Sequence, residues 1–598
     1  MAPNYGSTSA HRGLKWAVAA AVGLVAWFVF HNAIRGSMLQ WDDDINLQGN
    51  VHLRALTAAN IRWMFTDSTY VRRYVPLGWL AFAVDYRFFG PGPRSYHVLN
   101  LALHSADSAL VFLLVLKLMR MLPECRPWAQ GRLAILAAAA GALVWAVHPL
   151  RVETVSWASG MYCQAAFFLL LSFLAYLESV SARAGSPARR LALTGSVLAF
   201  AMSLTSYPLA LGYAGVLVVV DALVLRRLPA ASGGWTGSGN LRVWAEKIPY
   251  FIVTAVVFGI TVNARFHAAG VWEPPPTLAQ FGAFPRIMQA CYIWAYYVWK
   301  PVFPLHLSPV YTTLVWFDPS DPKFIASLAA VAGISALLLW KRHAWPKTLA
   351  LWCCHLILLV PVLGLTEHPH YANDRYSYLV AIPVSAAIAI ALLRLGRSRV
   401  GRMAALGSVF VVVAALGRAS AAQVGIWRDS ETLFRHMLVE LGPDPYRADI
   451  LWRLGTLMKR EGRQAEEVAA FGEAVRAEPG WAAGHRDLGL ALIEAGEAES
   501  GRDELRNALR IDPGLADARL DLAEALFKAG RVTEAIATAE ELVRMDPSAA
   551  GYYDLSVMYG REGRYGEAMR ACRQALAIEP ANPQVIALRQ ALEAAGAR

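Results

Sequence analysis

The chain has 598 residues, of which 56% are hydrophobic and 17% are charged, and its formal net charge is +11 at pH 7. Soluble domains carry about 25% charged residues, so this composition argues against an average soluble enzyme, a disordered chain or a disulfide scaffold. Residues 1–426 contain 34 Lys+Arg and 16 Asp+Glu, whereas residues 427–598 contain 22 and 29. The contrast predicts a membrane domain (1–426), a linker or entry helix (427–447) and a water-exposed domain (448–598).

Apolar runs of about 20 residues, the length that spans a bilayer core, recur along the first domain. They predict an all-α polytopic bundle with eleven spans, at 15–36, 95–120, 132–148, 160–180, 190–206, 208–226, 246–265, 323–341, 347–366, 375–394 and 401–420. The first run is long for a signal peptide and has no small-residue cleavage site after it. We therefore interpret it as a retained signal anchor.

Clusters of Lys and Arg between these runs predict which connections face the cytoplasm. The clusters lie at 117–132, 183–190, 226–247, 341–347 and 394–402. Together with the N-terminus they are expected inside, and the alternate connections are expected outside: 37–94, 149–159, around 207, 266–322 and 367–374. The basic residues thus serve membrane topology, and no nucleic-acid partner is predicted.

One further apolar run, at 284–303, has an ambiguous assignment. The spans 246–265 and 323–341 already connect two inside clusters, so this run is expected to be re-entrant or to lie along the outer surface. A twelfth span is the alternative.

Eleven spans place the C-terminal domain outside. The Ala- and Arg-rich, Lys-poor composition indicates a GC-rich bacterium, so we expect an inner-membrane protein with a periplasmic C-terminal domain.

The C-terminal domain contains about four repeats. Glycines recur at Gly462, Gly496, Gly530 and Gly563, and prolines at Pro479, Pro513, Pro547 and Pro580, in steps of 34, 34 and 33 residues. This is the period of the tetratricopeptide repeat, or TPR, in which two helices flank a turn. Such repeats stack into an α-solenoid with a concave face. We expect that groove to bind a protein or peptide; a purely structural cap is the alternative.

The predicted outer loops contain the polar residues that are candidates for chemistry. Asp42, Asp43 and Asp44 are adjacent, and their mutual repulsion favours a raised pKa for one of them. A carboxylate at the membrane surface suits a general base or a ligand of a divalent cation. The alternative is a helix cap or solvated loop acids.

The six cysteines form no CxxC pair and are interpreted as packing residues, so no cofactor is firmly predicted.

A second group lies at the start of the second span. Asp85 belongs to a short apolar helix, 76–89, that is expected on the outer surface. His97, Asn100 and His104 follow at i, i+3 and i+7, on one helix face. They form either a metal triad or, as we favour, a polar interhelical stripe near a cavity.

Two more outer loops contain arginine with polar neighbours. One contains His148, Arg151 and Glu153, just after the apolar run that Pro149 ends. The other contains Asp374, Arg375, Tyr376 and Tyr378. Arginine suits phosphate because its planar fork donates two parallel hydrogen bonds, so the second loop is expected to meet an anionic headgroup. Ordinary interfacial anchoring by Arg and Tyr is the alternative for both.

Taken together, these motifs resemble a known family. Asp44 is six residues before Asn50, and Tyr96-His97-Val-Leu-Asn100, His148-Pro149-Leu-Arg151-Val-Glu153 and Asp374-Arg375-Tyr376-Ser-Tyr378 follow, ahead of the repeats. The arrangement resembles the multispan O-mannosyltransferases that carry tetratricopeptide repeats, and their bacterial relatives, within the C-type glycosyltransferase superfamily. Val75-Pro76-Leu77 departs from the family's Arg-Pro-Leu, with Arg72 or Arg73 as substitutes, and Thr205-Ser206-Tyr207 replaces its Lys-Glu pair.

The resemblance implies an inverting transferase that uses a sugar, mannose or another hexose, on a polyprenyl-phosphate carrier. It implies that Asp43 or Asp44 is the catalytic base and that Arg375 stabilises the leaving phosphate. The other motif residues of the two arginine loops are expected to bind the donor phosphate or the substrate: His148, Arg151, Glu153, Asp374, Tyr376 and Tyr378. The acceptor would be a protein hydroxyl on the extracytoplasmic side. The alternatives are a transferase that modifies an envelope lipid or glycan, and a non-catalytic membrane scaffold.

Overall fold

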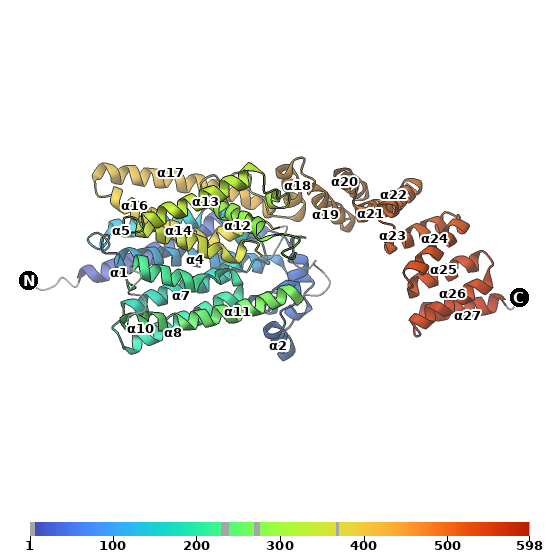
Figure 1. Cartoon of the computed structure of the whole chain (residues 1–598), viewed down its shortest axis with the longest axis horizontal. Coiled ribbons are helices and arrows are strands. Elements are labelled where there is room, and N and C mark those ends of the chain that lie inside the picture. Colours follow the sequence, from blue (N-terminus) through green and yellow to red (C-terminus); the bar gives the residue numbers. More distant parts are fainter. Residues whose placement is uncertain (1–5, 229–237, 268–275, 366–369, 597–598) are drawn as a thin grey trace, which may run out of the picture. The chain divides into compact units, whose positions relative to one another are not determined.

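The computed structural model describes residues 6–228, 238–267, 276–365 and 370–596 (Figure 1). Every regular element in these ranges is a helix, which confirms the all-α class. The chain divides into two compact units, Met1–His436 and Met437–Arg598, and the division falls within α18 (Ser430–Leu441). The predicted outer loops 266–322 and 367–374 lie partly outside the described residues.

The first unit is a bundle of long apolar helices joined by short helical turns. Its α-helices are α1 (Gly6–Phe30), α2 (Ala58–Thr66), α3 (Pro76–Phe89), α4 (Pro93–Met121), α5 (Arg132–Ala146), α6 (Val152–Ser156), α7 (Tyr162–Ser181), α8 (Pro187–Ser206), α9 (Tyr213–Val219), α10 (Ser238–Ala245), α11 (Ile248–His267), α12 (Ala283–Trp299), α13 (Pro322–Trp340), α14 (Pro346–Leu359), α15 (Ser377–Val380), α16 (Ile382–Leu395) and α17 (Arg399–Val424). Several of them begin with proline at the first or second position, where its missing N–H costs nothing.

Each predicted span coincides with a helix or a pair of helices in this unit. Six helices are long and apolar enough to cross a membrane, and up to eight segments qualify if each of two bent pairs counts as one span. Two shorter apolar helices, Tyr213–Val224 and Pro346–Val362, account for further predicted spans. The chain is therefore a membrane protein, while the count of eleven remains a prediction. The 17 residues of α12 extend about 25 Å, less than a bilayer core of about 30 Å.

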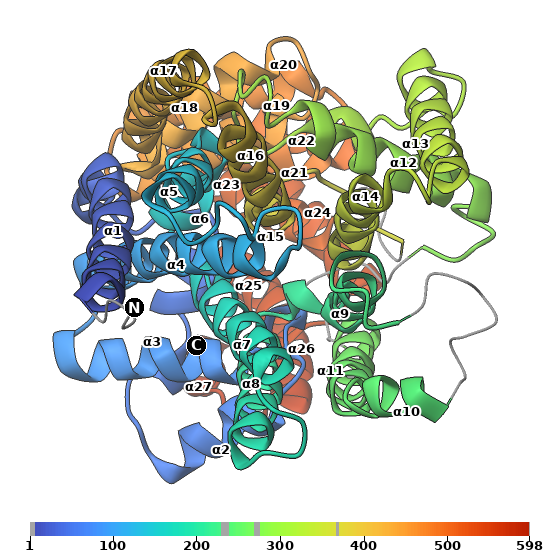
Figure 2. The same cartoon turned by 90° about the vertical axis from the view of Figure 1, so that its left-hand side faces the viewer.

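The two bent pairs determine where the polar loops lie. The chain turns by 61° between Arg132–Ala146 and Pro149–Ser156, and by 54° between Asp374–Val380 and Ile382–Leu395. Each bend contains a proline, Pro149 or Pro383, which cannot donate the hydrogen bond that would continue a straight helix. The short helices at the bends, α6 and η10 (Asp374–Tyr376), pack against each other. Helix α4 lies among α1, α5, α7 and α16 (Figure 2).

The second unit consists of stacked helix pairs. Its helices are α19 (Arg447–Arg460), α20 (Gln464–Ala477), α21 (Ala482–Glu494), α22 (Ala498–Ile511), α23 (Ala516–Lys528), α24 (Val532–Met545), α25 (Ala549–Arg561), α26 (Tyr565–Ile578) and α27 (Pro583–Gly596). The four repeated glycines have φ between 71° and 90°, so each supplies the left-handed turn within a pair. Small residues such as Ala539 and Ala575 are fully buried where the helices meet. The predicted repeat solenoid is confirmed.

Candidate active site

An ion pair between the two bends is the centre of the candidate site. Glu153 on α6 is 3% exposed, and its Oε1 pairs with the Arg375 guanidinium. The Arg375 backbone N–H also donates to Glu153 Oε2 over 2.8 Å. The two residues are 222 positions apart in the chain. One carboxylate therefore positions both the backbone and the side chain of the arginine that the sequence singles out.

Aromatic rings surround the Arg375 guanidinium. Its Nε donates to the Tyr162 hydroxyl over 2.9 Å, and that hydroxyl lies 3.1 Å from the Tyr207 hydroxyl. The guanidinium carbon, Cζ, lies 5.2 Å from the Trp157 ring centre and 5.1 Å from the Tyr376 ring centre. At these distances the rings attract the guanidinium through cation–π contacts while leaving its charge unchanged.

Further arginines approach the same tyrosines. The Arg73 guanidinium interacts electrostatically with Tyr162, Tyr207 and Arg375, and forms an ion pair with Asp42 at 3.6 Å. Arg265, in the last turn of α11, interacts with Tyr207 and Arg73. Three guanidinium groups thus lie around Tyr162 and Tyr207, and two of them pair with carboxylates, Arg375 with Glu153 and Arg73 with Asp42. A group of guanidinium side chains in a low-dielectric region favours an anionic ligand.

The first outer loop reaches this cluster through Asp43. Its side chain is fully buried, and its oxygens accept hydrogen bonds from the backbone N–H groups of Leu39 and Ser159, both over 2.9 Å. Burial raises the pKa of Asp43 to about 7, the two N–H donors oppose that shift, and neighbouring Asp42 adds to it. Asp43 therefore attaches the loop to the segment that contains Trp157 and Tyr162.

Asp44 occupies a different environment. It begins a single π-helical turn, η2 (Asp44–Gln48), and is partly exposed. Within the described parts of the chain, its carboxylate makes no hydrogen bond or ion pair, whereas Asp42 is engaged by Arg73. Single π-helical turns occur frequently at functional sites. Of the three adjacent carboxylates, Asp44 is the one whose lone pairs are available to a substrate.

Asn100 supports the segment that joins Asp43 to Arg375. Its Nδ2 donates to the carbonyls of Trp157 and Ala158 over 2.9 and 3.3 Å. The Trp157 indole N–H in turn donates to the Trp41 carbonyl over 2.9 Å. Segment 157–159 is thus held from α4 on one side and from the acidic loop on the other.

A second set of predicted residues lies deeper in the bundle. His104 Nδ1 lies 2.8 Å from the Tyr378 hydroxyl, which donates to Asp107 over 2.9 Å. Arg151 is 1% exposed and donates to Ser377 Oγ over 2.9 Å. These contacts connect α4, the first bend and α15, so they hold the bends together and do not contact the Arg375 guanidinium directly.

The remaining predicted residues have separate local partners. Asp85 accepts a hydrogen bond from Ser95 Oγ over 2.6 Å, which joins α3 to the start of α4. His97 is fully buried against the Gly36 backbone, where an added Cβ would lie 2.9 Å from its Nε2. Asp374 accepts from the Tyr311 hydroxyl over 2.8 Å. The described residues contain no group of three His, Cys, Asp or Glu side chains able to hold a metal ion.

An apolar cavity of about 510 Å³ opens beside the first bend. His148 and Arg151 lie at one part of its wall, and most of the rest is formed by side chains of α5, α12, α13, α14 and α16, among them Leu338 and Trp352. The Nε2 of His148 lies 2.8 Å from the Pro301 carbonyl, so this histidine joins the bend to the segment after α12.

Sequence patterns did not identify Tyr162, Ser159, Asp107 or Arg265 as site residues. Tyr162 and Arg265 lie at the ends of apolar runs, where aromatic and basic residues usually serve as interfacial anchors. Only their contacts with residues far away in the chain distinguish them. Arg73, in contrast, is expected from the sequence as a substitute for a missing family arginine.

Comparisons with known proteins each match a part of the chain. Residues 492–556 match the family model described as "Tetratricopeptide repeat", and residues 551–598 match "Fis1 C-terminal tetratricopeptide repeat". The chain is 31% identical over 169 residues to the Homo sapiens "Protein O-mannosyl-transferase TMTC4", covering 26% of this chain and 22% of that protein. It is 32% identical over 121 residues to the Xenopus laevis "Protein O-mannosyl-transferase tmtc2", covering 20% and 13%.

The predicted resemblance is confirmed. The matches nevertheless span less than a quarter of the length of these curated relatives. Among solved structures, the crystal structure of MamA has a TM-score of 0.24 and 22% identity, and the match covers 25% of this chain and 88% of that one.

Proposed function

We propose that this chain is an inverting membrane glycosyltransferase that moves mannose or another hexose from a polyprenyl-phosphate carrier to a protein hydroxyl. The observation that carries the proposal is the assembly of the acidic loop and the arginine cluster into one site. Segment 157–162 joins them: Ser159 binds Asp43, while Trp157 and Tyr162 contact Arg375. The names of the relatives, protein O-mannosyl-transferases, support the same reaction class.

The arginine cluster is the proposed binding site for the carrier phosphate. Arg375 and Arg73 offer planar donor forks that match phosphate oxygens. When the bond between the anomeric carbon and the phosphate oxygen breaks, that oxygen gains negative charge. The Arg375 guanidinium, which Glu153 and two aromatic rings already hold in place, stabilises this charge without reorganising.

Asp44 is the proposed general base. Its carboxylate takes the proton of the acceptor hydroxyl, the resulting oxygen attacks the anomeric carbon, and the carrier phosphate leaves from the opposite face, which inverts the configuration. The exposure and free lone pairs of Asp44 support this assignment. Asp43 is a positioning residue instead, because both of its oxygens already accept backbone N–H groups and its side chain is fully buried.

The apolar cavity beside Arg151 is the proposed place of the carrier's isoprenoid chain. Its wall is almost entirely hydrocarbon, and Arg151 and His148 mark the end nearest to the first bend. A lipid-borne donor explains why the reaction needs a membrane protein. We further propose that the repeats bind the protein acceptor and that the site faces the periplasm of a bacterium.

The test is intact-mass glycoproteomics of cell-envelope proteins, comparing wild type with Asp44→Asn and Arg375→Gln at equal expression. Removing the general base, as in Asp44→Asn, lowers the rate of sugar transfer by about 10²- to 10⁴-fold. Hexose-sized additions should therefore disappear from specific proteins in this variant, and also in Arg375→Gln, which lacks the proposed phosphate-binding guanidinium. Asp318→Asn, an exposed carboxylate in another predicted outer loop, is the matched control and should retain them.

Two other outcomes would contradict this function. Unchanged protein masses with altered envelope lipids or glycans would indicate a transferase with a different acceptor. If neither proteins nor glycans changed while deletion of residues 437–598 still produced a phenotype, the chain would be a scaffold.

A further inference from the structure

A basic cavity lies at the opposite ends of the helices that lead into the candidate active site. Its volume is about 770 Å³. Its wall is formed by residues near the start of α1, in the last turns of α4 and α7, and after η7 (Val220–Val224). On α4, Lys117 in this cavity is 17 residues beyond Asn100, about 25 Å along the helix. The cavity is therefore separate from the site around Arg375.

The charge of the cavity wall is strongly unbalanced. Five basic side chains line it, Lys15, Lys117, Arg120, Arg126 and Arg227, with a single carboxylate, Glu178. Glu178 pairs with Lys117 at 2.9 Å and is itself well exposed. Basic side chains therefore outnumber carboxylates in the wall, so binding of an anion there lowers the electrostatic free energy of the unit.

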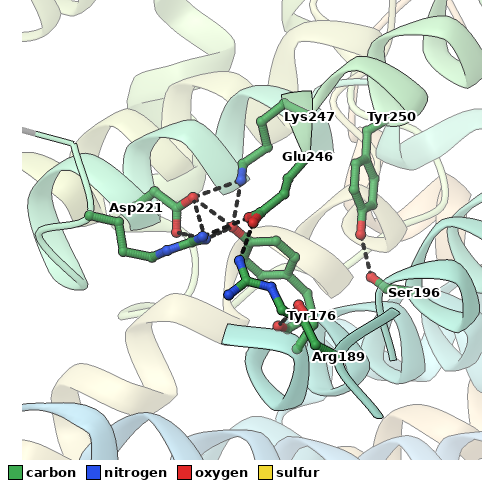
Figure 3. Close-up of polar contacts among 9 residues, drawn as sticks. Tyr176, Arg189, Ser196, Asp221, Glu246, Lys247 and Tyr250 are labelled. Atoms are coloured by element: carbon green, nitrogen blue, oxygen red, sulfur yellow. Dashed lines mark hydrogen bonds and ion pairs between the residues drawn. The ribbon is translucent and has the colours of Figure 1, made fainter. Parts of the chain in front are cut away.

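A buried network holds one of these cations in place. Figure 3 shows Asp221, Glu246, Lys247 and Tyr176 directed toward one another. Arg227 donates to Asp221 Oδ2 over 3.0 Å and to Glu246 Oε2 over 2.7 Å, and Lys247 donates to Asp221 Oδ2 over 2.7 Å. Asp221 is fully buried within the π-helical turn η7. The network fixes the position of Arg227, so this part of the wall is preorganised.

The same cavity has an apolar wall that continues into the bundle. Leu113 and Leu116 of α4 face it one helical turn before the cations, and Leu174 of α7 and Trp16 of α1 complete this part. Cations next to hydrocarbon at the end of spanning helices match a ligand with a charged head and an acyl tail. Basic pockets between membrane helices bind lipid headgroups in this way, and tryptophan prefers the interface.

We propose that this cavity binds the phosphate headgroup of an anionic phospholipid, with an acyl chain along Leu113, Leu116 and Leu174. The lipid would neutralise the basic wall and join α1, α4 and α7 at the end that is distant from the candidate active site. This site is independent of the proposed transfer reaction, because it shares no residue with it.

The experiment is a native mass spectrometry titration of the detergent-solubilised full chain with phosphatidylglycerol, phosphatidylcholine as the reference lipid, and inorganic phosphate. Phosphatidylglycerol should bind more tightly than phosphatidylcholine. The double variant Lys117→Gln, Arg126→Gln should lose on the order of 25-fold in affinity, since each cation near a lipid headgroup contributes about fivefold. The charge-conserving variant Lys117→Arg, Arg126→Lys should retain binding.

The matched control is Arg342→Gln, Arg399→Gln, which removes two cations that are exposed and lie outside the cavity. Equal binding of the two lipids by the wild type, or equal losses in the two double Gln variants, would overturn the proposal. Displacement of the lipid by millimolar inorganic phosphate would also overturn it and assign the cavity to free phosphate. Matching thermal unfolding of all variants confirms that each one is folded.

Discussion

At the scale of single residues, three adjacent carboxylates have three different environments. Asp42 pairs with Arg73, Asp43 is buried and accepts two backbone N–H groups, and Asp44 is partly exposed at the start of a π-helical turn. Their chemistry therefore follows from what surrounds each of them. The same holds for Arg375, whose orientation depends on Glu153 and on the rings of Trp157 and Tyr376.

Asp43 should make the stability of the chain depend on pH. Its pKa is about 7 in the folded chain, against 3.8 as the ordinary value. Between these values the folded state keeps a proton that the unfolded state has lost, so the free energy of unfolding falls as pH rises from about 4 through 7, by on the order of 4 kcal/mol. Thermal unfolding from pH 5 to pH 8 should show this decline in wild type and in Asp44→Asn, and a flatter profile in Asp43→Asn. An unchanged slope in Asp43→Asn would refute the assignment.

The Glu153–Arg375 pair should show strong energetic coupling. Glu153→Gln and Arg375→Gln each leave a buried charge without its partner, which costs about 3–5 kcal/mol. The double variant removes both charges, so its loss should be clearly smaller than the sum of the two single losses. Equilibrium unfolding in mixed detergent measures all four proteins of the cycle. Additive losses would mean that the pair contributes nothing as a pair.

At the scale of elements, the site depends on two interrupted helices. Pro149 and Pro383 bend their segments by 61° and 54°, and the short helices α6 and η10 at these bends meet. In the repeat unit, glycine takes the place of proline. One set of glycines forms the turns between paired helices, and another set lies where two helices pack closely. Gly501 is one of these: an added Cβ would lie 2.6 Å from both the Gly489 carbonyl oxygen and Ile493 Cγ1.

Two glycine substitutions should therefore have opposite effects. Gly501→Ala forces α21 and α22 apart and should destabilise this pair by about 1–3 kcal/mol. Gly472→Ala places its methyl group in ordinary van der Waals contact, 3.6 Å from Nη1 of Arg476, and should stabilise α20 by about 0.5–1 kcal/mol. Hydrogen exchange of the full chain measures both: α21 amides should exchange faster in Gly501→Ala, and α20 amides more slowly in Gly472→Ala. Equal exchange in the two variants would contradict the packing argument.

At the scale of the whole molecule, the membrane unit separates two chemically distinct ends. The acidic loop and the arginine cluster lie at one end of α1, α4 and α7, and the basic cavity lies at the other. Because these helices are long and apolar enough to cross a membrane, we expect the two ends to lie at opposite surfaces.

Thiol labelling should detect this polarity. Ala58→Cys on α2 and Ala184→Cys after α7 both place a cysteine at an exposed position, whereas five of the six native cysteines are buried and Cys353 is partly buried. A membrane-impermeant maleimide should label Ala58→Cys in intact cells and Ala184→Cys only after permeabilisation, with the unmodified chain as the background. Labelling of both positions in intact cells would exclude the predicted sides.

The sequence by itself determined the helical class, the places of the apolar segments and the repeat period. These follow from local patterns, because a helix needs a run of suitable residues and a repeat needs a fixed spacing. Burial free energy depends on apolar area and has no direction, so an apolar run does not show which neighbour it meets. Only the tertiary structure decided that Glu153 meets Arg375, that Tyr162 and Tyr207 join them, and that Asp43 rather than Asp44 is buried. Those contacts arise where bent helices pack, between residues up to 222 positions apart.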